Sequence, residues 1–286
     1  MADEATSPPE WEVWALRVGS AQRRARDNFL QPGDRSGLMR LDFTVWVARR
    51  DGRVVVVDTG FSDFSGDKRG RRLDRRPAAA VRSLGIEPDE VDHVVLTHLH
   101  YDHAGNIGDF PHARVVVQAS ELEYTTGRPM THASLSHFFE VEDVVDVVRR
   151  VHGGGVHVVD GDVELAPGLE LYLIGGHTKG LQVVRVRTRR GWVVLASDAA
   201  HYFENLTERN PFPAILDLGQ MLDGYDRLAE LAEGPDHIVP GHDPQVFARY
   251  AESEAALTEG VVGLHETPSP ATAGREGAER HGLSPA

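Results

Sequence analysis

The sequence predicts one α/β domain in which two β-sheets lie between outer layers of helices. Short Val-rich runs with strand character occur in both halves of the chain, and amphipathic helical patterns follow them. Residues with metal-binding side chains repeatedly come directly after such a run. The length of 286 residues is sufficient for one large domain with a substantial core.

Strands dominate the first part of the chain. We expect them at residues 11–18, 39–48, 53–58, 92–97 and 114–118, where β-branched and aromatic residues are frequent. A helix is expected between the third and fourth of these strands, near residues 77–84. Another helix follows the fifth strand, because apolar residues repeat at i, i+3, i+4 and i+7, namely Val141, Val144, Val145 and Val148.

The second half of the chain repeats this theme. Strands are expected at residues 156–159, 169–174, 181–188 and 192–197. A second amphipathic helix is then indicated by Met221, Leu222, Tyr225, Leu228 and Ala229. A last short strand is expected at residues 237–239. Because strands outnumber helices in this pattern, we expect the sheets to be inside and the helices outside.

The most informative segment follows the strand at residues 92–97. It reads HLHYDH from residue 98 to residue 103, and so contains three imidazoles and a carboxylate. Positions i and i+2 of an extended segment point the same way, so His98 and His100 can bind one ion while Asp102 and His103 turn toward a second. A solvated turn is the simpler alternative, but it leaves the further ligand types downstream unexplained. We therefore expect a two-metal site.

Three more residues with metal-binding side chains stand just past other strand-type runs. They are His177, Asp198 and His242. Glycine directly precedes both histidines and gives the chain room to turn. The repeated placement of a ligand after a strand predicts that all these side chains gather along one rim of the sheets.

Together these motifs resemble the metallo-β-lactamase-fold hydrolases. The similar segments, in the family's order, are residues 54–60 (VVVVDTG), 97–105 (THLHYDHAG), 176–178 (GHT), 197–198 (SD) and 240–243 (PGHD). The similarity runs from about residue 11 to about residue 250 and so covers nearly all of the chain. The resemblance implies the αββα fold, a sandwich of two β-sheets flanked by helices.

Within this superfamily, the residues narrow the choice of branch. The chain has no Cys, which many β-lactamases of the fold use as a ligand. His100 stands where di-iron oxidoreductases have Glu, which favours a zinc-type hydrolase. Asp198 matches the bridging aspartate of glyoxalase-II-like thioesterases, tRNA-processing phosphodiesterases and N-acyl-homoserine lactonases. The lactonases are the most similar, on residues 197–205 (SDAAHYFEN).

The resemblance also implies how the ligands are divided between two divalent metal ions. One metal would be held by His98, His100 and His177, and the other by Asp102, His103 and His242, with Asp198 bridging both. Zn²⁺ is the expected ion, although Mn, Fe and Co accept the same ligands. A hydroxide shared by the two ions would attack the carbonyl of a lactone. Asp102 is expected to be a catalytic residue as well as a ligand.

One departure from the lactonases concerns the residue that would assist the leaving group. Those enzymes have Tyr three residues after the bridging Asp, whereas this chain has His201 there and Tyr202 one place later. If this segment is extended, the two side chains point to opposite faces, so only one of them faces the site. We predict that Tyr202 turns inward as the catalytic hydrogen-bond donor, with His201 as its rival. The other interpretation is that Tyr202 and Phe203 only wall the pocket.

Asp58, at the end of the strand at residues 53–58, is a candidate to support a ligand. A metal-bound imidazole usually donates its second N–H to a carboxylate or a carbonyl. We therefore expect Asp58 to hold one of the ligand imidazoles. The alternative is that Asp58 only caps its own turn.

Composition and charge limit the partners of the protein. Lys plus Arg is 30 and Asp plus Glu is 44, which gives a formal net charge of -14. This charge disfavours a nucleic-acid partner, because the phosphate backbone is also negative. The sequence contains neither an apolar run of about eighteen residues nor a signal-peptide pattern at its start, so we expect no membrane partner and a cytoplasmic location. The expected partner is a small-molecule lactone or ester.

Some segments fall outside the regular pattern. We expect residues 1–10 to be a flexible N-terminus, residues 11–264 the hydrolase domain, and residues 265–286 a disordered tail rich in Pro, Gly, Ala and Ser. Residues 62–77 form a basic island in an acidic protein, with Lys68, Arg69, Arg71, Arg72, Arg75 and Arg76. This island is either a solvated loop or a flap over the metal site that meets an anionic or carbonyl-rich substrate.

Three functions agree with the motifs. The first is a dinuclear-metal hydrolase that opens a lactone. The second is a glyoxalase-II-like thioesterase or another carboxylic ester hydrolase; the thioesterase would need basic groups in a C-terminal helical region to hold glutathione. The third is a metal-stabilised binding protein without turnover, which the intact ligand set disfavours. A comparison of lactone and thioester hydrolysis separates the first two.

Overall fold

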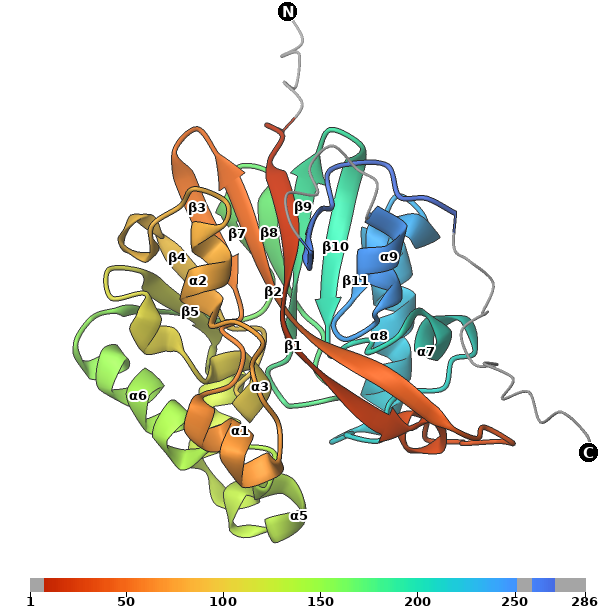
Figure 1. Ribbon diagram of the computed structural model, residues 1–286. Helices are drawn as coiled ribbons and strands as arrows, with labels where there is room; N and C mark the ends of the chain where they lie inside the picture. Colours follow the sequence, from red (N-terminus) through yellow and green to blue (C-terminus); the bar gives the residue numbers. More distant parts are fainter. Residues whose placement is uncertain (1–7, 251–258, 271–286) are drawn as a thin grey trace, which may run out of the picture.

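The protein is described by a computed structural model that covers residues 8–250 and 259–270. Two β-sheets pack face to face, and helices cover their outer faces (Figure 1). The first half of the chain supplies most of one sheet, and the second half supplies the other. The predicted α/β class and its αββα layers are confirmed.

The first sheet has seven strands in the order β12-β1-β2-β3-β4-β5-β6. The pairs among β12, β1, β2 and β3 are antiparallel, and those from β3 to β6 are parallel. The strand bounds are β1 (Glu12–Arg24), β2 (Leu38–Arg50), β3 (Arg53–Val57), β4 (His93–Val95), β5 (Arg114–Gln118), β6 (Val156–Val159) and β12 (Val261–Gly263). Parallel strands are usually buried on both faces, and β3 to β5 accordingly consist mainly of Val.

The second sheet has five strands in the order β11-β10-β9-β8-β7. Only the pair of β10 with β11 is parallel. The strand bounds are β7 (Val163–Ala166), β8 (Leu169–Leu173), β9 (Gln182–Thr188), β10 (Gly191–Ser197) and β11 (Ile238–Pro240).

The helices separate into two groups that cover opposite sides of the sandwich (Figure 1). Their bounds are α1 (Asp63–Arg69), α2 (Pro77–Arg82), α3 (Tyr101–Ala104), α4 (Ala119–Thr126), α5 (Ala133–Ser136), α6 (Val141–His152), α7 (Phe203–Thr207), α8 (Leu218–Leu231) and α9 (Gln245–Tyr250). Helix α6 packs on the first sheet through Val144 and Val147, and α8 packs on the second sheet. The predicted stripe of α6 is therefore wrong in part, because Val141 is exposed and Val147 takes its place in the core.

Three separate hydrophobic clusters account for the four layers. Alternate residues of a strand point to opposite faces of its sheet. In β1, Val13 and Ala15 pack between the two sheets, whereas Trp14 and Leu16 pack beneath the helices on the outer face. In β10, Val193 and Leu195 likewise lie between the sheets, whereas Val194 and Ala196 lie under α8. Both faces of the central strands are therefore buried in hydrophobic core. This packing fixes the position of the strand ends that carry the predicted ligands.

The structure adds short elements to those that the sequence predicted. Strands β5 and β6 have the predicted bounds, whereas β1 extends to Arg24. Two short edge strands, β7 and β12, were not predicted, because runs of three or four residues carry little periodic signal. Helix α1 also lies unpredicted within the basic island.

The prediction of a disordered tail from residue 265 onward is wrong for its first residues. His265 is buried, and its ring contacts Trp14 edge-on at 5.1 Å between ring centroids. The backbone N–H of Ser269 donates to the carbonyl of Arg249 at 2.7 Å. Residues 271–286, like residues 1–7 of the predicted flexible N-terminus, lie outside the described residues.

The basic island is a folded segment rather than an open loop. Ser62 caps α1 by accepting the N–H of Ser65 at 3.2 Å, and Gly70 ends the helix at φ 62°. Lys68 and Arg69 both bind the buried carboxylate of Glu140, which precedes α6. These ion pairs fasten α1 to the neighbouring helical layer.

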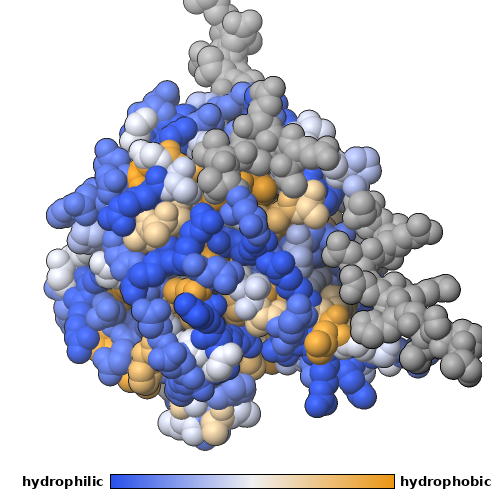
Figure 2. All heavy atoms as spheres, viewed as in Figure 1, coloured by the Kyte–Doolittle hydropathy of each residue, from blue (hydrophilic) through white to orange (hydrophobic). Residues whose placement is uncertain are grey.

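Among the described residues, no helix is long and apolar enough to cross a membrane. The face of the molecule in Figure 2 is mainly hydrophilic, and hydrophobic residues occur on it only in small separate patches. This face agrees with the large number of charged residues in the chain.

Candidate metal centre

The predicted ligands lie at the ends of neighbouring strands. The segment with His98, His100, Asp102 and His103 follows β4 and runs into α3. The other three ligands follow the ends of β8, β10 and β11. These strands, from both sheets, end at the same rim, so residues far apart in sequence meet there.

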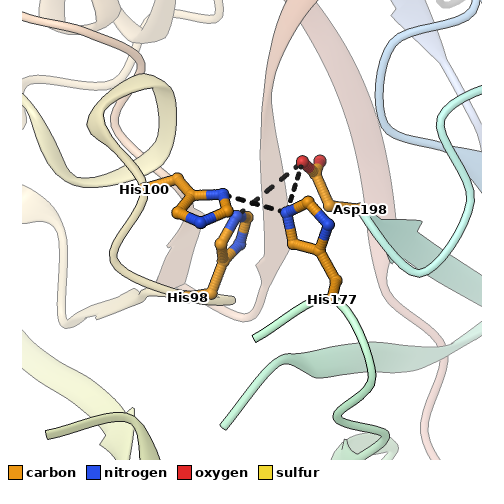
Figure 3. A group of neighbouring side chains, drawn as sticks. All are labelled: His98, His100, His177 and Asp198. Carbon is orange, nitrogen blue, oxygen red and sulfur yellow. Dashed lines mark hydrogen bonds and ion pairs between the residues drawn. The ribbon is translucent and has the colours of Figure 1, made fainter. Parts of the chain in front are cut away.

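The structure brings all seven predicted ligands together. His98, His100, His177 and Asp198 form one group, and their nearest ring nitrogens and carboxylate oxygen lie within 4.8 Å of one another (Figure 3). Asp102, His103 and His242 form a second group by the same measure. Asp198 joins the groups, because its Oδ2 is 3.1 Å from Nε2 of His177 and its Oδ1 is 2.9 Å from Nε2 of His242.

Hydrogen bonds on the far side of four rings determine which nitrogen faces the centre. Nδ1 of His177 donates to the carbonyl of Ala214 at 2.6 Å, and Nδ1 of His242 donates to the carbonyl of Asp42 at 2.7 Å. Nδ1 of His103 donates to the carboxylate of Asp58 at 2.7 Å. The hydroxyl of Thr97 donates its proton to Asp58. It therefore accepts the hydrogen bond from Nδ1 of His98, at 3.1 Å. With Nδ1 bonded on the far side, each of these rings directs Nε2 inward.

The donor set fits divalent cations. Nε2 of His98 and Nε2 of His103 are buried and have no hydrogen-bond partner within the described part of the chain. Nε2 of His242 lies 2.9 Å from Oδ1 of Asp198, and, although burial acts in the opposite direction, this carboxylate raises the pKa of His242. Buried polar atoms without a partner, such as Nε2 of His98 and of His103, are costly, and a bound cation would satisfy them. Imidazole and carboxylate together suit Zn²⁺ and its first-row neighbours.

Burial sets the protonation of the first group. Burial lowers the pKa of His98 and of His100 well below the usual range, and the neighbouring imidazoles lower both further. Burial acts in the opposite direction on Asp198, but the surrounding imidazoles hold the pKa of that carboxyl well below its usual range. His98 and His100 thus offer unprotonated rings and Asp198 offers a charged carboxylate, which are the forms that bind cations. In the second group, although burial acts in the opposite direction, Asp198 raises the pKa of His103 and of His242.

The prediction that Asp58 holds a ligand imidazole is confirmed. Besides its contact with His103, Asp58 accepts the backbone N–H and the hydroxyl of Thr97, both at 2.8 Å. Its backbone lies in the left-handed region at φ 61°, which is uncommon for a residue other than glycine. The strained turn after β3 therefore orients one ligand directly and supports His98 through Thr97.

Sequence reasoning missed Glu121, which holds two ligand loops together. This residue is in α4, is fully buried, and accepts the N–H of Leu99 and the N–H of Gly180, both at 2.9 Å. Burial raises the pKa of Glu121, while these two N–H groups favour its charged form. Leu99 lies between two ligands, and Gly180 closes the loop that carries His177. A Glu in the first turn of a helix resembles an ordinary solvated residue, so the sequence offered no signal for this role.

Removal of the Glu121 carboxylate is expected to loosen both loops. Glu121→Ala leaves two buried N–H groups without acceptors, which should lower the free energy of unfolding by on the order of 3 kcal/mol. Denaturant unfolding of the metal-loaded protein measures this change. Glu123→Ala is the matched control, because Glu123 is exposed and its ion pair with Lys179 contributes at most about 1 kcal/mol. Equal midpoints for the two variants would contradict this role for Glu121.

The structure differs from the expectation that Tyr202 turns into the site. The Tyr202 hydroxyl donates to the carbonyl of Arg40 at 3.2 Å, and its ring packs beside Phe29. His201 instead faces the centre, with Nε2 3.2 Å from Oδ2 of Asp198 and its ring stacked on Phe212 at 3.8 Å between centroids. Burial lowers the pKa of His201 to about 4. The two side chains do point in different directions, but the choice between them was wrong.

A cavity of about 330 Å³ opens beside the first ligand group. His100 and His177 form one wall of it. The remaining lining residues are mostly apolar: Tyr124, Ser134, Leu135, His137, Phe138, Pro213, Ala214, Ile215 and Leu216. The cavity can therefore hold an apolar group of a molecule whose polar part lies at the centre.

Comparisons with known proteins agree with this geometry. A curated N-acyl homoserine lactonase, AiiA of Bacillus thuringiensis, is 30% identical over 167 residues, which are 57% of this chain and 60% of that protein. The match thus spans less than two thirds of that relative. An N-acyl homoserine lactonase of Bacillus cereus is 26% identical over 237 residues, 77% of this chain and 88% of the relative.

Solved structures share the fold. A quorum-quenching N-acyl homoserine lactone lactonase has a TM-score of 0.69 at 24% identity, over 83% of this chain and 94% of that chain. AidC, a dizinc quorum-quenching lactonase, has a TM-score of 0.64 at 16% identity, over 83% of this chain and 89% of its own. The family model of the metallo-beta-lactamase superfamily matches residues 43–242, which include every predicted ligand. This match covers more than half of the chain, and the protein therefore belongs to the metallo-beta-lactamase superfamily.

Proposed function

We propose that this protein is a metal-dependent hydrolase that opens a lactone in a centre of two divalent cations. The observation that carries the proposal is the convergence of seven His and Asp side chains, with buried imidazole lone pairs directed into a common space. The relatives named N-acyl homoserine lactonase support a cyclic ester as the substrate. Zn²⁺ is the ion that we expect.

The two ligand groups divide the centre as the family resemblance implies. His98, His100 and His177 would hold one cation, and Asp102, His103 and His242 the other, with Asp198 between them. When bound, two such cations supply a water that loses its proton near neutral pH and an electrophile for the carbonyl oxygen. Burial keeps His98 and His100 unprotonated. The Nδ1 hydrogen bonds fix the direction of four rings, namely His98, His103, His177 and His242.

The other side chains at the centre would position the substrate. The cavity beside His100 and His177 would take an apolar acyl group and so place the ester carbonyl at the ligands. His201, rather than Tyr202, is then the donor that faces the oxygen of the leaving alkoxide. Ser197 does not act as a nucleophile in this proposal, because its hydroxyl is buried and lies 2.9 Å from that of Thr97.

A substrate panel tests the proposal. The Zn²⁺-loaded protein is given N-hexanoyl-homoserine lactone, a glutathione thioester and a phosphodiester, and kcat/KM is measured for each. We expect the lactone to exceed both others by about tenfold or more, because the cavity matches an acyl chain and the net charge repels polyanions. A chelator should abolish the activity, and Zn²⁺ should restore it.

The outcome also separates the alternatives. A thioester that exceeds every lactone by tenfold would identify a glyoxalase-II-like thioesterase. Stoichiometric metal without hydrolysis of any ester would identify a binding protein. Either result contradicts the lactonase proposal.

A further inference from the structure

Two arginines, Arg23 of β1 and Arg71 of the basic island, meet at the edge of the metal centre. Arg71 donates to the hydroxyl of Tyr101, the residue before the ligand Asp102. Arg23 lies over the ring of Phe212 at 4.8 Å, and Phe212 stacks on His201. Burial lowers the pKa of Arg23, and the nearby charge of Arg71 lowers it further. The two guanidinium groups are thus close enough to repel each other.

Strand register places Arg23 on the face of the β1–β2 hairpin that looks toward the centre. Arg23 pairs with Met39 and Gly19 pairs with Phe43, and directly opposite residues share a face. The Phe43 ring lies 5.8 Å from the ring of His242 and 5.2 Å from the guanidinium carbon of Arg71. Both arginines therefore lie on the side of the centre that carries the second ligand group.

Neither guanidinium is neutralised by a carboxylate in the part of the chain that the structure describes. Arg23 donates to the side-chain oxygen of Asn28 and to the carbonyl of Asp27, and Arg71 donates to a phenol. Their neighbours in the basic island differ: Arg69 and Lys68 bind Glu140, and Arg76 binds Asp63. In a chain with a net charge of -14, two half-buried arginines without an acidic partner form an isolated positive site.

We propose that Arg23 and Arg71 bind a carboxylate carried by the substrate, so that the ester opened at the centre belongs to an acidic lactone. This inference rests on the proposed function. A guanidinium matches a carboxylate because its N–H groups form a planar fork. The apolar cavity lies beside the first ligand group and the arginines beside the second. The substrate would therefore lie across the centre with its acidic group on the arginine side.

Matched lactones test the pair by activity. The substrates are 5-oxotetrahydrofuran-2-carboxylate and its carboxamide, which differ in charge and hardly in shape. The wild type should favour the carboxylate in kcat/KM. Arg71→Gln and Arg23→Gln should each lower the carboxylate-to-carboxamide ratio by roughly tenfold or more, mainly through KM. Arg71→Lys, which keeps the charge and loses the fork, should give an intermediate ratio.

Arg72→Gln and Arg24→Gln are the matched controls, because both residues are exposed and each adjoins one of the pair. Their ratios should equal that of the wild type. Added NaCl should lower the wild-type ratio, since a charge contact at an open site is screened by salt. A ratio that stays unchanged in Arg23→Gln and Arg71→Gln would overturn the proposal, as would a wild type that prefers the carboxamide.

A binding experiment keeps this result separate from the hydrolase proposal. Calorimetric titration of the Zn²⁺-loaded protein compares glutarate with glutaramate, and adipate with its monoamide, so that only the second carboxylate differs. Wild type should prefer the dicarboxylate in at least one pair, and the Arg23→Gln/Arg71→Gln double variant should lose that preference. If no lactone is opened but the preference and its loss are observed, only the hydrolase proposal fails. If neither dicarboxylate is preferred, the arginine proposal fails whatever the enzyme hydrolyses.

Discussion

His100→Ala and Asp198→Asn are expected to abolish hydrolysis and to lower the metal content below the two ions per chain of the wild type. Nδ1 of His100 lies 2.9 Å from Nε2 of His177, so its removal opens the first ligand group. Asp198 contacts imidazoles of both groups, and its amide variant keeps the shape but loses the charge. We expect kcat/KM to fall by about a thousandfold or more. The loss of a single oxyanion-stabilising group in an enzyme already has an effect of about this size, and here a metal ion is lost as well.

Metal analysis and steady-state kinetics on the same samples measure both effects. His157→Ala is the control, because His157 is an exposed histidine of the edge strand β6 and belongs to neither ligand group. It should keep two ions and full activity. A fully active wild type with one ion or fewer per chain would refute the dinuclear centre.

His201→Ala is expected to lower kcat by about 10-fold to 100-fold, the range of a lost general acid or oxyanion donor. His201 faces the centre through its contact with Asp198, and Phe212 fixes the plane of its ring. Tyr202→Phe should retain nearly full activity, because the hydroxyl that it removes contacts the carbonyl of Arg40 instead. Both variants should keep two metals. His201→Gln, which retains a donor, should recover part of kcat.

The division between kcat and KM distinguishes the possible roles of His201. A donor that acts chiefly in the transition state lowers kcat, whereas a pocket wall raises KM. Loss of one metal in His201→Ala would instead identify His201 as a metal ligand. A ring nitrogen of His201 lies within 4.8 Å of the possible ligand atoms of Asp198 and His242, so the three side chains could share one ion. If Tyr202→Phe lost kcat while His201→Ala did not, the orientation seen in the structure would not be the catalytic one.

Local patterns sufficed for most of the fold. Runs such as Val54 to Val57 of β3 are buried on both faces and consist only of valine, so the strand is evident from a few letters. The helix α6 was equally clear from its apolar repeat, but its buried face was not, because Val144 and Val147 pack on the sheet while Val141 is exposed. Edge strands such as β12 escaped prediction, since three residues paired on one side have no distinctive composition.

The ligand segments were predictable for a related reason. The metal-binding side chains lie just after the end of a strand. The local sequence there shows both the apolar run of the strand and the glycine or other turn residue that ends it. Glu121 could not be recognised in this way, because its partners Leu99 and Gly180 lie 22 and 59 residues away. The packing of His265 on Trp14 likewise depends on a contact between the two ends of the described chain.

The amino-acid sequence by itself determined the layered α/β fold, the seven His and Asp side chains that gather at the centre, and the hydrogen bond of Asp58 to one of them. Each of these depends on short-range patterns of apolar and polar residues. Only the tertiary structure decided that His201 and not Tyr202 faces the centre, and that Arg23 and Arg71 converge beside it. The physical reason is that the direction of each of these side chains depends on a contact with a residue distant in sequence. Such contacts include those with Phe212, Arg40 and Tyr101, and they form only when separate elements pack together.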